Sequence, residues 1–441
     1  MKKKDLLGYS NEQYKVFVKK AWIVLLAFSI LYCFLYCGRQ NLSFAIPVMM
    51  REEGWTALQL GLLSSVQFWT YALGHLVNGR LGEIVGINKL IIIGMSVSAI
   101  LNVLIGFQTS LFVITVLWGI NGYVQSMLWS PGMALIANWW PGNKRGFATG
   151  FANAFSGLGS IITAFAVTVS FAVLPEMGWR AGFTGAGIVM IIVLILYPFF
   201  TKEKPSDIGL PEYIDSNDER EANDWELRAV IEEKGRLYPY IYLLRQWKFD
   251  LWIVIIACSS IARYGLLTWI PTYYVEVYYV DIEAGIMGSI VCPLGMAAGA
   301  LIIPWLSDKF WSQDRLPWVI LSSIGSIAAV FGFMNAEPGL LASVLLFMAG
   351  FFIYGINSLV WAFATDIGGR IFGGTATGIL DCAAYIGASV QAVFFGNILT
   401  NSGNWNLVFL CIVGILGIMV IASILAGTGR NDSRRLIERT A

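Results

Sequence analysis

Apolar runs of about 20 residues recur along almost the whole chain, and each is long enough to cross a ~30 Å hydrocarbon core as an α-helix. Twelve such runs can be counted, at residues 20–47, 58–79, 88–107, 111–136, 147–173, 180–200, 248–275, 283–306, 316–334, 338–363, 373–399 and 404–427. A chain with this pattern folds in lipid rather than in water. The sequence therefore predicts an all-α integral membrane protein with twelve transmembrane helices.

The composition agrees with this prediction. Hydrophobic residues make up 57% of the chain and charged residues 13%, whereas about a quarter of the residues of a soluble domain are charged. This balance excludes a soluble enzyme, and the net charge of +1 excludes a basic nucleic-acid-binding protein. The six cysteines and the single histidine do not follow a metal-ligand spacing. We therefore expect no metal, no cofactor and no nucleic-acid partner.

Lysine and arginine residues give the expected orientation, because cytoplasmic loops of membrane proteins carry an excess of both. Six lysines within residues 1–20 predict a cytoplasmic N-terminal tail, and an even number of crossings places the C-terminus on the same side. One long hydrophilic segment separates six runs from six. We expect an N-terminal six-helix half at 1–200, a cytoplasmic linker at 201–247 and a C-terminal six-helix half at 248–441.

Short sequences repeat between the two halves at nearly the same offset. Arg39 in the first run and Arg263 in the seventh each begin an Arg-x6-Ile-Pro segment. Ala148-Thr-Gly in the fifth run likewise matches Ala376-Thr-Gly in the eleventh. Such repeats are typical of transporters whose halves rock about a site at the membrane midplane. We therefore expect two pseudo-symmetric six-helix bundles.

One loop and three helical segments resemble known transporter sequences. The loop Gly79-Arg-Leu-Gly-Glu83-Ile-Val-Gly86 is similar to a motif of the major facilitator superfamily, with Glu83 in place of the usual aspartate. The segments Tyr36-Cys-Gly-Arg39-Gln-Asn41, Gly122-Tyr-Val-Gln125-Ser-Met-Leu-Trp129 and Arg263-Tyr264-Gly265 resemble the organophosphate:phosphate antiporters, a family of glycerol 3-phosphate and hexose phosphate exchangers. The resemblance implies the major facilitator fold, with Arg39 and Arg263 holding the substrate phosphate.

Three positions depart from the pattern of that family. Family members tend to carry a lysine where His75 stands, and glycerol 3-phosphate carriers tend to carry a histidine where Ser156 stands. Asp381 adds an acid at a position where the resemblance implies an uncharged residue. These departures indicate that the substrate can differ from the usual one of the family.

Four ionisable residues fall inside the expected crossings, namely Arg39, His75, Arg263 and Asp381. A charge at the bilayer centre costs about 2.5 to 3.5 kcal/mol, so such residues face the protein interior or a wet cavity. Two arginine forks converging from opposite halves can hold one phosphate, because each offers planar, bidentate donors. Each arginine could instead neutralise a buried acid, but Asp381 alone cannot serve both.

The other candidate substrate contacts are aromatic or polar residues on the faces that carry these charges. They are Tyr32, Tyr36, Tyr71, Gln125, Trp129, Asn153, Ser156, Tyr264, Tyr354 and Tyr385. His75 is either a substrate contact or proton acceptor, or a neutral imidazole that bonds two helices. Asp381 is either the partner of Arg39 or Arg263 in a salt bridge that breaks when substrate arrives, a proton site, or a structural pair.

These observations lead to a functional expectation. We expect a secondary active transporter in the cytoplasmic membrane that exchanges an organic phosphate for inorganic phosphate by alternating access and acts as a monomer. The organic phosphate is glycerol 3-phosphate, a sugar phosphate or a phosphoglycerate. Two alternatives stay open: a proton-coupled symporter of a carboxylate such as a sugar acid, and a transporter-like sensor of a sugar phosphate. An enzyme is not expected, because no pair of catalytic nucleophile and base is recognisable.

Overall fold

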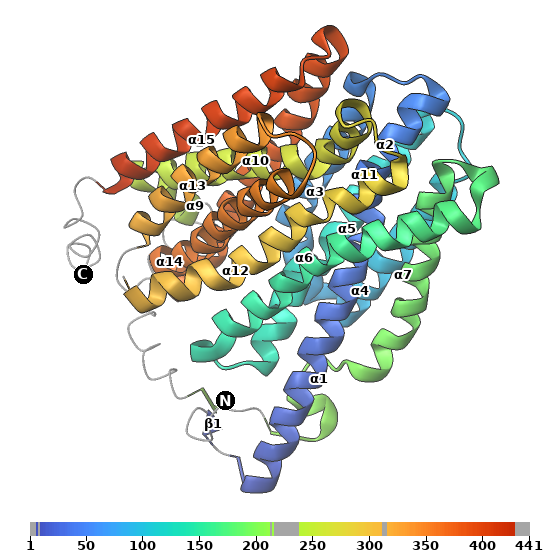
Figure 1. Ribbon diagram of the computed structural model, residues 1–441. Helices are drawn as coiled ribbons and strands as arrows, with labels where there is room; N and C mark the ends of the chain where they lie inside the picture. Colours follow the sequence, from blue (N-terminus) through green and yellow to red (C-terminus); the bar gives the residue numbers. More distant parts are fainter. Residues whose placement is uncertain (1–5, 8, 212–213, 216–237, 311–314, 428–441) are drawn as a thin grey trace.

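The computed structural model describes residues 6–7, 9–211, 214–215, 238–310 and 315–427 (Figure 1). A few side chains within these ranges, including those of Arg80 and Glu83 in the loop motif, lie outside the description, as does much of the expected linker. The described chain is almost entirely helical. Its one sheet is the short antiparallel pair β1 (Leu6–Leu7) and β2 (Ile214–Asp215).

The N-terminal half contains seven helical segments that make six crossings. They are α1 (Asn11–Leu35), α2 (Cys37–Glu53), α3 (Ala57–Val85), α4 (Ile87–Ile105), α5 (Leu111–Trp139), α6 (Gly142–Val173) and α7 (Arg180–Phe200), with the 3-10 turns η2 (Pro175–Met177) and η3 (Pro205–Ile208) after α6 and α7. The first crossing comprises α1 and α2, because the helix is interrupted only at Tyr36. Capping boxes begin α1 at Ser10 and α3 at Thr56, where each side chain accepts from a backbone N–H of the first turn.

The C-terminal half follows the same plan. Its segments are α9 (Tyr238–Leu244), α10 (Trp247–Val277), α11 (Ile282–Ser289), α12 (Val291–Phe310), α13 (Leu316–Met334), α14 (Leu340–Ser402) and α15 (Trp405–Gly427). The eighth crossing comprises α11 and α12. The element α14 contains both the tenth and the eleventh crossings, Leu340–Trp361 and Ala376–Ser402, and the connection between them is itself helical.

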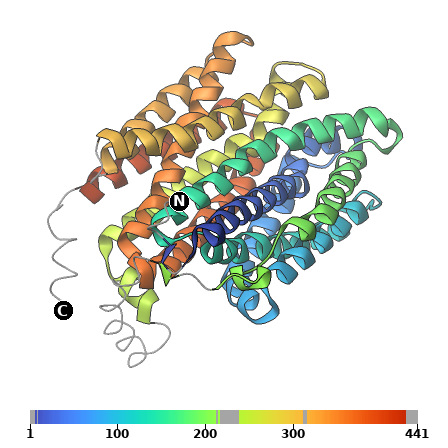
Figure 2. The same cartoon turned by 90° about the horizontal axis from the view of Figure 1, so that it is seen from below.

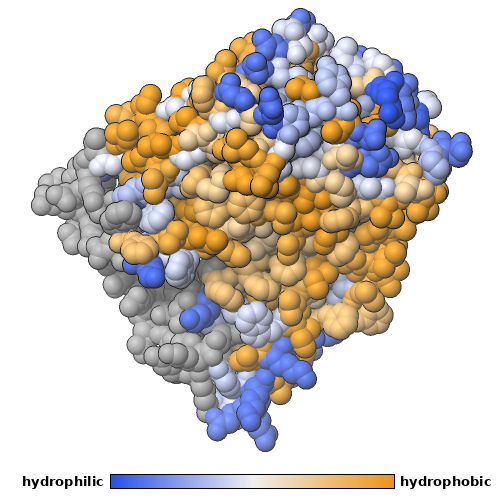
Figure 3. All heavy atoms as spheres, viewed as in Figure 1, coloured by the Kyte–Doolittle hydropathy of each residue, from blue (hydrophilic) through white to orange (hydrophobic). Residues whose placement is uncertain are grey.

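The prediction of a twelve-helix membrane protein is confirmed. Among the described residues, eleven stretches are long and apolar enough to cross a membrane. The remaining crossing is α3, which has 29 residues but a more polar sequence. Large apolar side chains such as Phe165, Ile192, Leu301 and Ile421 point outward. Figure 3 shows a broad apolar band on one face of the molecule with hydrophilic groups gathered beyond its edges, the surface expected of a protein that spans a bilayer.

The two halves pack side by side, the blue-to-green helices against the yellow-to-red ones (Figures 1 and 2). The contact between them is made mainly by α3 against α14 and by α6 against α12, with α2 against α10 completing it. Four of these helices, α2, α3, α10 and α14, carry the ionisable residues of the expected crossings. The fold therefore brings those residues to the interface between the halves.

Candidate substrate site

Arg39 is anchored at one end of its guanidinium group and unpartnered at the other. Its Nε donates to Oε1 of Gln125 on α5 over 3.1 Å. Its Nη1 and Nη2 are buried, and neither has a hydrogen-bond partner among the described residues. The Cζ atom lies 4.0 Å from the centre of the Tyr71 ring and 5.3 Å from that of Tyr36. The fork is thus fixed in place, with its two terminal donors available for an oxyanion.

Gln125 is held by a polar network inside the N-terminal half. Its Nε2 donates to the carbonyl oxygen of Gly38 over 2.8 Å and to Oγ of Ser98 over 3.1 Å. Nδ2 of Asn121 donates to the same carbonyl over 2.9 Å. A side chain on Gly38 would collide with this network, because its Cβ would lie 2.7 Å from Nδ2 of Asn102. Glycine at this position lets three helices, α2, α4 and α5, meet behind Arg39.

Arg263 is held mainly by aromatic rings. On α10, its Cζ lies 4.7 Å from the ring centre of Tyr264 and 4.4 Å from that of Tyr354. Its Nη2 donates to the Tyr354 hydroxyl over a long 3.4 Å, and its buried Nε has no hydrogen-bond partner in the described part of the chain. Cation–π contacts of this kind stabilise a buried guanidinium without neutralising its charge. Arg263 therefore also keeps donors for an anion.

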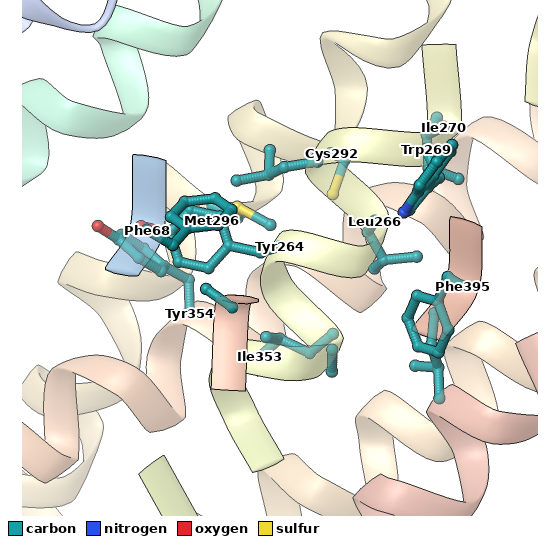
Figure 4. Packing of buried hydrophobic residues seen from close by; sticks show 14 of the residues in the cluster. Phe68, Tyr264, Leu266, Trp269, Ile270, Cys292, Met296, Ile353, Tyr354 and Phe395 are labelled. Atoms are coloured by element: carbon teal, nitrogen blue, oxygen red, sulfur yellow. The ribbon is translucent and has the colours of Figure 1, made fainter. Parts of the chain in front are cut away.

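Contacts across the interface join the surroundings of the two arginines. The Tyr354 hydroxyl lies 2.8 Å from Oγ of Ser156 and donates to Oδ1 of Asn153 over 3.4 Å. Figure 4 shows Phe68, from the N-terminal half, beside Tyr264 and Tyr354 of the other half, and the ring centres of Phe68 and Tyr264 are 4.8 Å apart. Both arginines thus belong to one cluster to which the two halves contribute.

His75 and Asp381 meet across the same interface. His75 Nε2 lies 3.9 Å from Oδ2 of Asp381, while its Nδ1 lies 2.7 Å from Oγ of Ser130. The imidazole contacts Tyr71, with ring centres 4.4 Å apart, and stacks on Tyr385 at 6.0 Å. The partners weighed for Asp381 in a salt bridge were Arg39 and Arg263, and the described residues contain no ion pair of Asp381 with either; its recorded neighbour is His75. Of the alternatives for Asp381, the salt bridge to an arginine is not present among the described residues in this conformation, and the roles of proton site and structural pair stay predictions.

Most of the predicted contacts gather in this cluster. Tyr36, Tyr71, Asn153, Ser156, Tyr264, Tyr354 and Tyr385 lie within it. Tyr32 and Trp129 stand at its edge, packed against each other with ring centres 4.7 Å apart, and Tyr32 touches Tyr36. Their roles as substrate contacts stay predictions, as do those of the other residues.

Three residues of the cluster do not follow from the sequence pattern. Ser130 binds His75, Phe68 packs on Tyr264, and Gly38 offers the carbonyl that holds Gln125. Gly38 lies within one of the matched segments and Ser130 directly follows Trp129 of another, which is the one signal that could have pointed to them. In the described part of the chain, no group of three or more His, Cys, Asp or Glu side chains is placed to bind a metal ion.

Comparison with known proteins finds transport proteins that are similar to this chain over almost its whole length. The chain is 24% identical to a probable hexose phosphate transport protein of Chlamydia pneumoniae, with 91% of this chain and 90% of that protein covered. It is 28% identical to the glycerol-3-phosphate transporter of Bacillus subtilis (strain 168), with 88% of each covered. These relatives agree with the resemblance to organophosphate:phosphate antiporters.

The fold is also similar to a solved structure. This is a bacterial homolog of the human lysosomal transporter Spinster in an inward-facing, unoccupied conformation, with a TM-score of 0.71 and 16% identity over 95% of this chain and 98% of that one. The sequence model of the Major Facilitator Superfamily matches residues 28–392. The chain is therefore a multi-pass membrane protein of transporter type, not an enzyme, and it belongs to the Major Facilitator Superfamily.

Proposed function

We propose that this protein exchanges an organic phosphate for inorganic phosphate across the cytoplasmic membrane by alternating access, as a monomer with both termini in the cytoplasm. The observation that carries the proposal is the pair of buried arginines, Arg39 and Arg263, which come from opposite halves and keep unpartnered donors at the interface. The names of the relatives from Chlamydia pneumoniae and Bacillus subtilis support a phosphate ester as substrate.

Two arginines suit a phosphate that must pass from one half to the other. A guanidinium donates two parallel hydrogen bonds to an oxyanion, and a phosphate has enough oxygens to be held by two forks at once. When the halves rock, the anion can stay bound to one fork while the other changes its angle. Arg39 is fixed by Gln125 and Arg263 rests on aromatic rings, so Arg263 is the fork that is freer to follow the anion.

Exchange follows from the charge of the empty site. Moving an unpaired charge through a low-dielectric interface is costly, so an empty carrier with net positive charge reorients slowly. An anion at the interface removes that cost, whichever direction the carrier moves. The site therefore favours a cycle in which each reorientation carries a phosphate compound.

The test is uptake of radiolabelled phosphate into vesicles that contain the purified protein. We expect rapid uptake when the vesicles are loaded with inorganic phosphate or an organic phosphate, and little uptake into empty vesicles. A second candidate, proton-coupled symport, is favoured by the contact of His75 with Asp381. It predicts the reverse pattern, in which an imposed pH gradient drives uptake of a phosphate or a sugar acid into empty vesicles.

A further inference from the structure

Asp381 is the one acid in the cluster that surrounds the two arginines. It lies on α14, and its side chain is largely buried, with 16% of its surface exposed. Its carboxylate lies 3.9 Å from His75, which packs on Tyr71, the ring that Arg39 also contacts, yet the described residues contain no ion pair of Asp381 with Arg39 or Arg263. The acid therefore shares the site with the arginines without occupying their donors.

His75 does not hydrogen-bond to this carboxylate. The two groups are 3.9 Å apart, whereas a charge-assisted hydrogen bond between nitrogen and a carboxylate oxygen is about 2.7 to 2.9 Å long. Instead, the ring nitrogen Nδ1 is bonded to Ser130 at 2.7 Å. The imidazole can remain neutral in this arrangement, so the negative charge of Asp381 is left without a dedicated partner.

The net charge of the site determines which ligand charge it binds best, because a bound ligand of equal and opposite charge leaves no excess charge in the buried site. When Asp381 is ionised and His75 is neutral, the single negative charge of Asp381 and the two positive charges of Arg39 and Arg263 leave the site with one net positive charge. The monoanion of inorganic phosphate balances this charge. A phosphate ester in its dianionic form leaves an excess negative charge in a buried site, which is unfavourable. A phosphate ester that also carries an ammonium group balances the charge again.

The surroundings of Asp381 also suit a cation. His75, which contacts the carboxylate, lies against Tyr71 and Tyr385, and the ring centres of those tyrosines are 4.6 Å apart. Aromatic faces beside a carboxylate attract ammonium groups, because the ring quadrupole and the charge act together. Tyr71 also contacts Arg39, whose Cζ lies over the ring, 4.0 Å from its centre. Tyr71 thus contacts both the anion-binding fork of Arg39 and the histidine beside the acid.

We propose that the preferred organic substrate is zwitterionic, an aminoalkyl phosphate or phosphonate or an amino-sugar phosphate, with Asp381 binding its ammonium group. This inference rests on the proposed function, because the phosphate of the same ligand is held by Arg39 and Arg263. It identifies Asp381 as the residue that determines specificity for the organic partner of inorganic phosphate.

The test compares two ligands that differ only in one group, 2-aminoethyl phosphate and 2-hydroxyethyl phosphate, with inorganic phosphate as reference. Dissociation constants are measured by calorimetry on the purified full-length protein in detergent. We expect the amine to bind the wild type at least about tenfold more tightly than the alcohol, the gain typical of a charge-assisted bond. In Asp381→Asn the preference is lost, while inorganic phosphate still binds. Asp250→Asn, an exposed acid at the start of α10, keeps the preference.

Three other outcomes contradict the inference, and a fourth contradicts the proposed function as well. Equal binding of the two ligands to the wild type removes the inference, and this comparison does not depend on any variant folding. A preference that survives in Asp381→Asn removes the role of Asp381. The wild type could instead bind the alcohol together with one proton, with the proton uptake lost in Asp381→Asn. Asp381 would then bind a proton rather than the ammonium group of a substrate, and the inference would be wrong. If no phosphate compound binds the wild type at all, the proposed function fails together with the inference.

Discussion

At the scale of single residues, the two arginines of the site are prepared for an anion in different ways. The Nε atom of Arg39 donates a hydrogen bond to Gln125, so the orientation of the guanidinium group is fixed before substrate arrives. This lowers the entropic cost of binding. Arg263 has only a long bond to Tyr354 and aromatic contacts. We therefore expect the affinity for phosphate to depend on the residues behind Arg39 as well as on the arginine itself.

Gln125→Leu tests that dependence. The substitution removes the acceptor of Arg39 Nε and one donor to the Gly38 carbonyl, and an unsatisfied buried group costs about 1 to 3 kcal/mol. We predict roughly tenfold weaker phosphate binding and a lower melting temperature. Gln108→Leu is the matched control, because Gln108 is half-buried just after the end of α4 and its side chain donates to the backbone carbonyl of Leu104, away from Arg39. Phosphate binding by Gln125→Leu equal to that of the wild type would contradict the role given to Gln125.

The sequence predicted the two arginines, and the reason is their cost in a membrane. A charged residue within an apolar run has few explanations other than a site, so Arg39 and Arg263 could be found without a structure. The contact of His75 with Asp381 could not, because it joins α3 and α14, which are far apart along the chain. Neither helix contains a pattern that specifies its partner.

At the scale of elements, the contact of α3 with α14 depends on close backbone approach. Gly61 on α3 faces the carbonyl oxygen of Ala392, with no room for a Cβ. A Cβ on Gly396 of α14 would lie 2.6 Å from the carbonyl oxygen of Ala57. Small residues allow membrane helices to approach closely, and here they do so on the side where α3 begins.

Gly61→Val is expected to prevent that approach. The larger side chain forces α3 away from α14, so the halves cannot close on this side, and exchange of phosphate falls at least about tenfold if closure is part of the cycle. Phosphate binding by the purified variant should persist, because the arginines lie elsewhere. Gly414→Ala on α15, where a Cβ meets nothing within 4 Å among the described residues, should exchange normally. Wild-type exchange by Gly61→Val would show that closure of α3 on α14 is not needed.

The membrane-spanning helices could be predicted from the sequence more completely than the site, except where polar residues interrupt the apolar pattern. The crossings follow from hydrophobic length, because the backbone of a chain in lipid must satisfy its own hydrogen bonds. On α3, the polar residues Gln67, Tyr71, His75 and Asn78 follow one another at helical spacing and form a polar stripe. Asn78 belongs to it but donates to Oγ of Ser126 over 2.6 Å inside the N-terminal half, so it joins two helices rather than facing the site. Periodicity alone does not distinguish these two roles.

At the scale of the whole molecule, the halves are closed on the side where α3 begins. The backbone N–H of Leu58 donates to Oγ1 of Thr400 over 2.8 Å, and Oγ of Ser65 lies 2.6 Å from Oγ of Ser389. In the proposed orientation, the closed side faces away from the cytoplasm.

A disulfide between Ser65→Cys and Ser389→Cys should hold the molecule in this closed form. Alternating access requires the two residues to separate in each cycle. We predict that oxidation of the double variant stops phosphate exchange in vesicles and that reduction restores it. Each single variant should be insensitive to the oxidant. Exchange that continues with the disulfide fully formed would contradict rocking of the two halves.

The central claim is that one arginine from each half holds the transported phosphate, and exchange of radiolabelled phosphate by arginine-to-lysine variants tests it most directly. Lysine keeps the charge but loses the bidentate fork. In vesicles loaded with inorganic phosphate, we predict that Arg39→Lys and Arg263→Lys each lose exchange by about 100-fold, equivalent to two charge-assisted hydrogen bonds. The wild type and Arg51→Lys, an exposed control on α2, exchange normally. Near-normal exchange by either site variant would contradict the account.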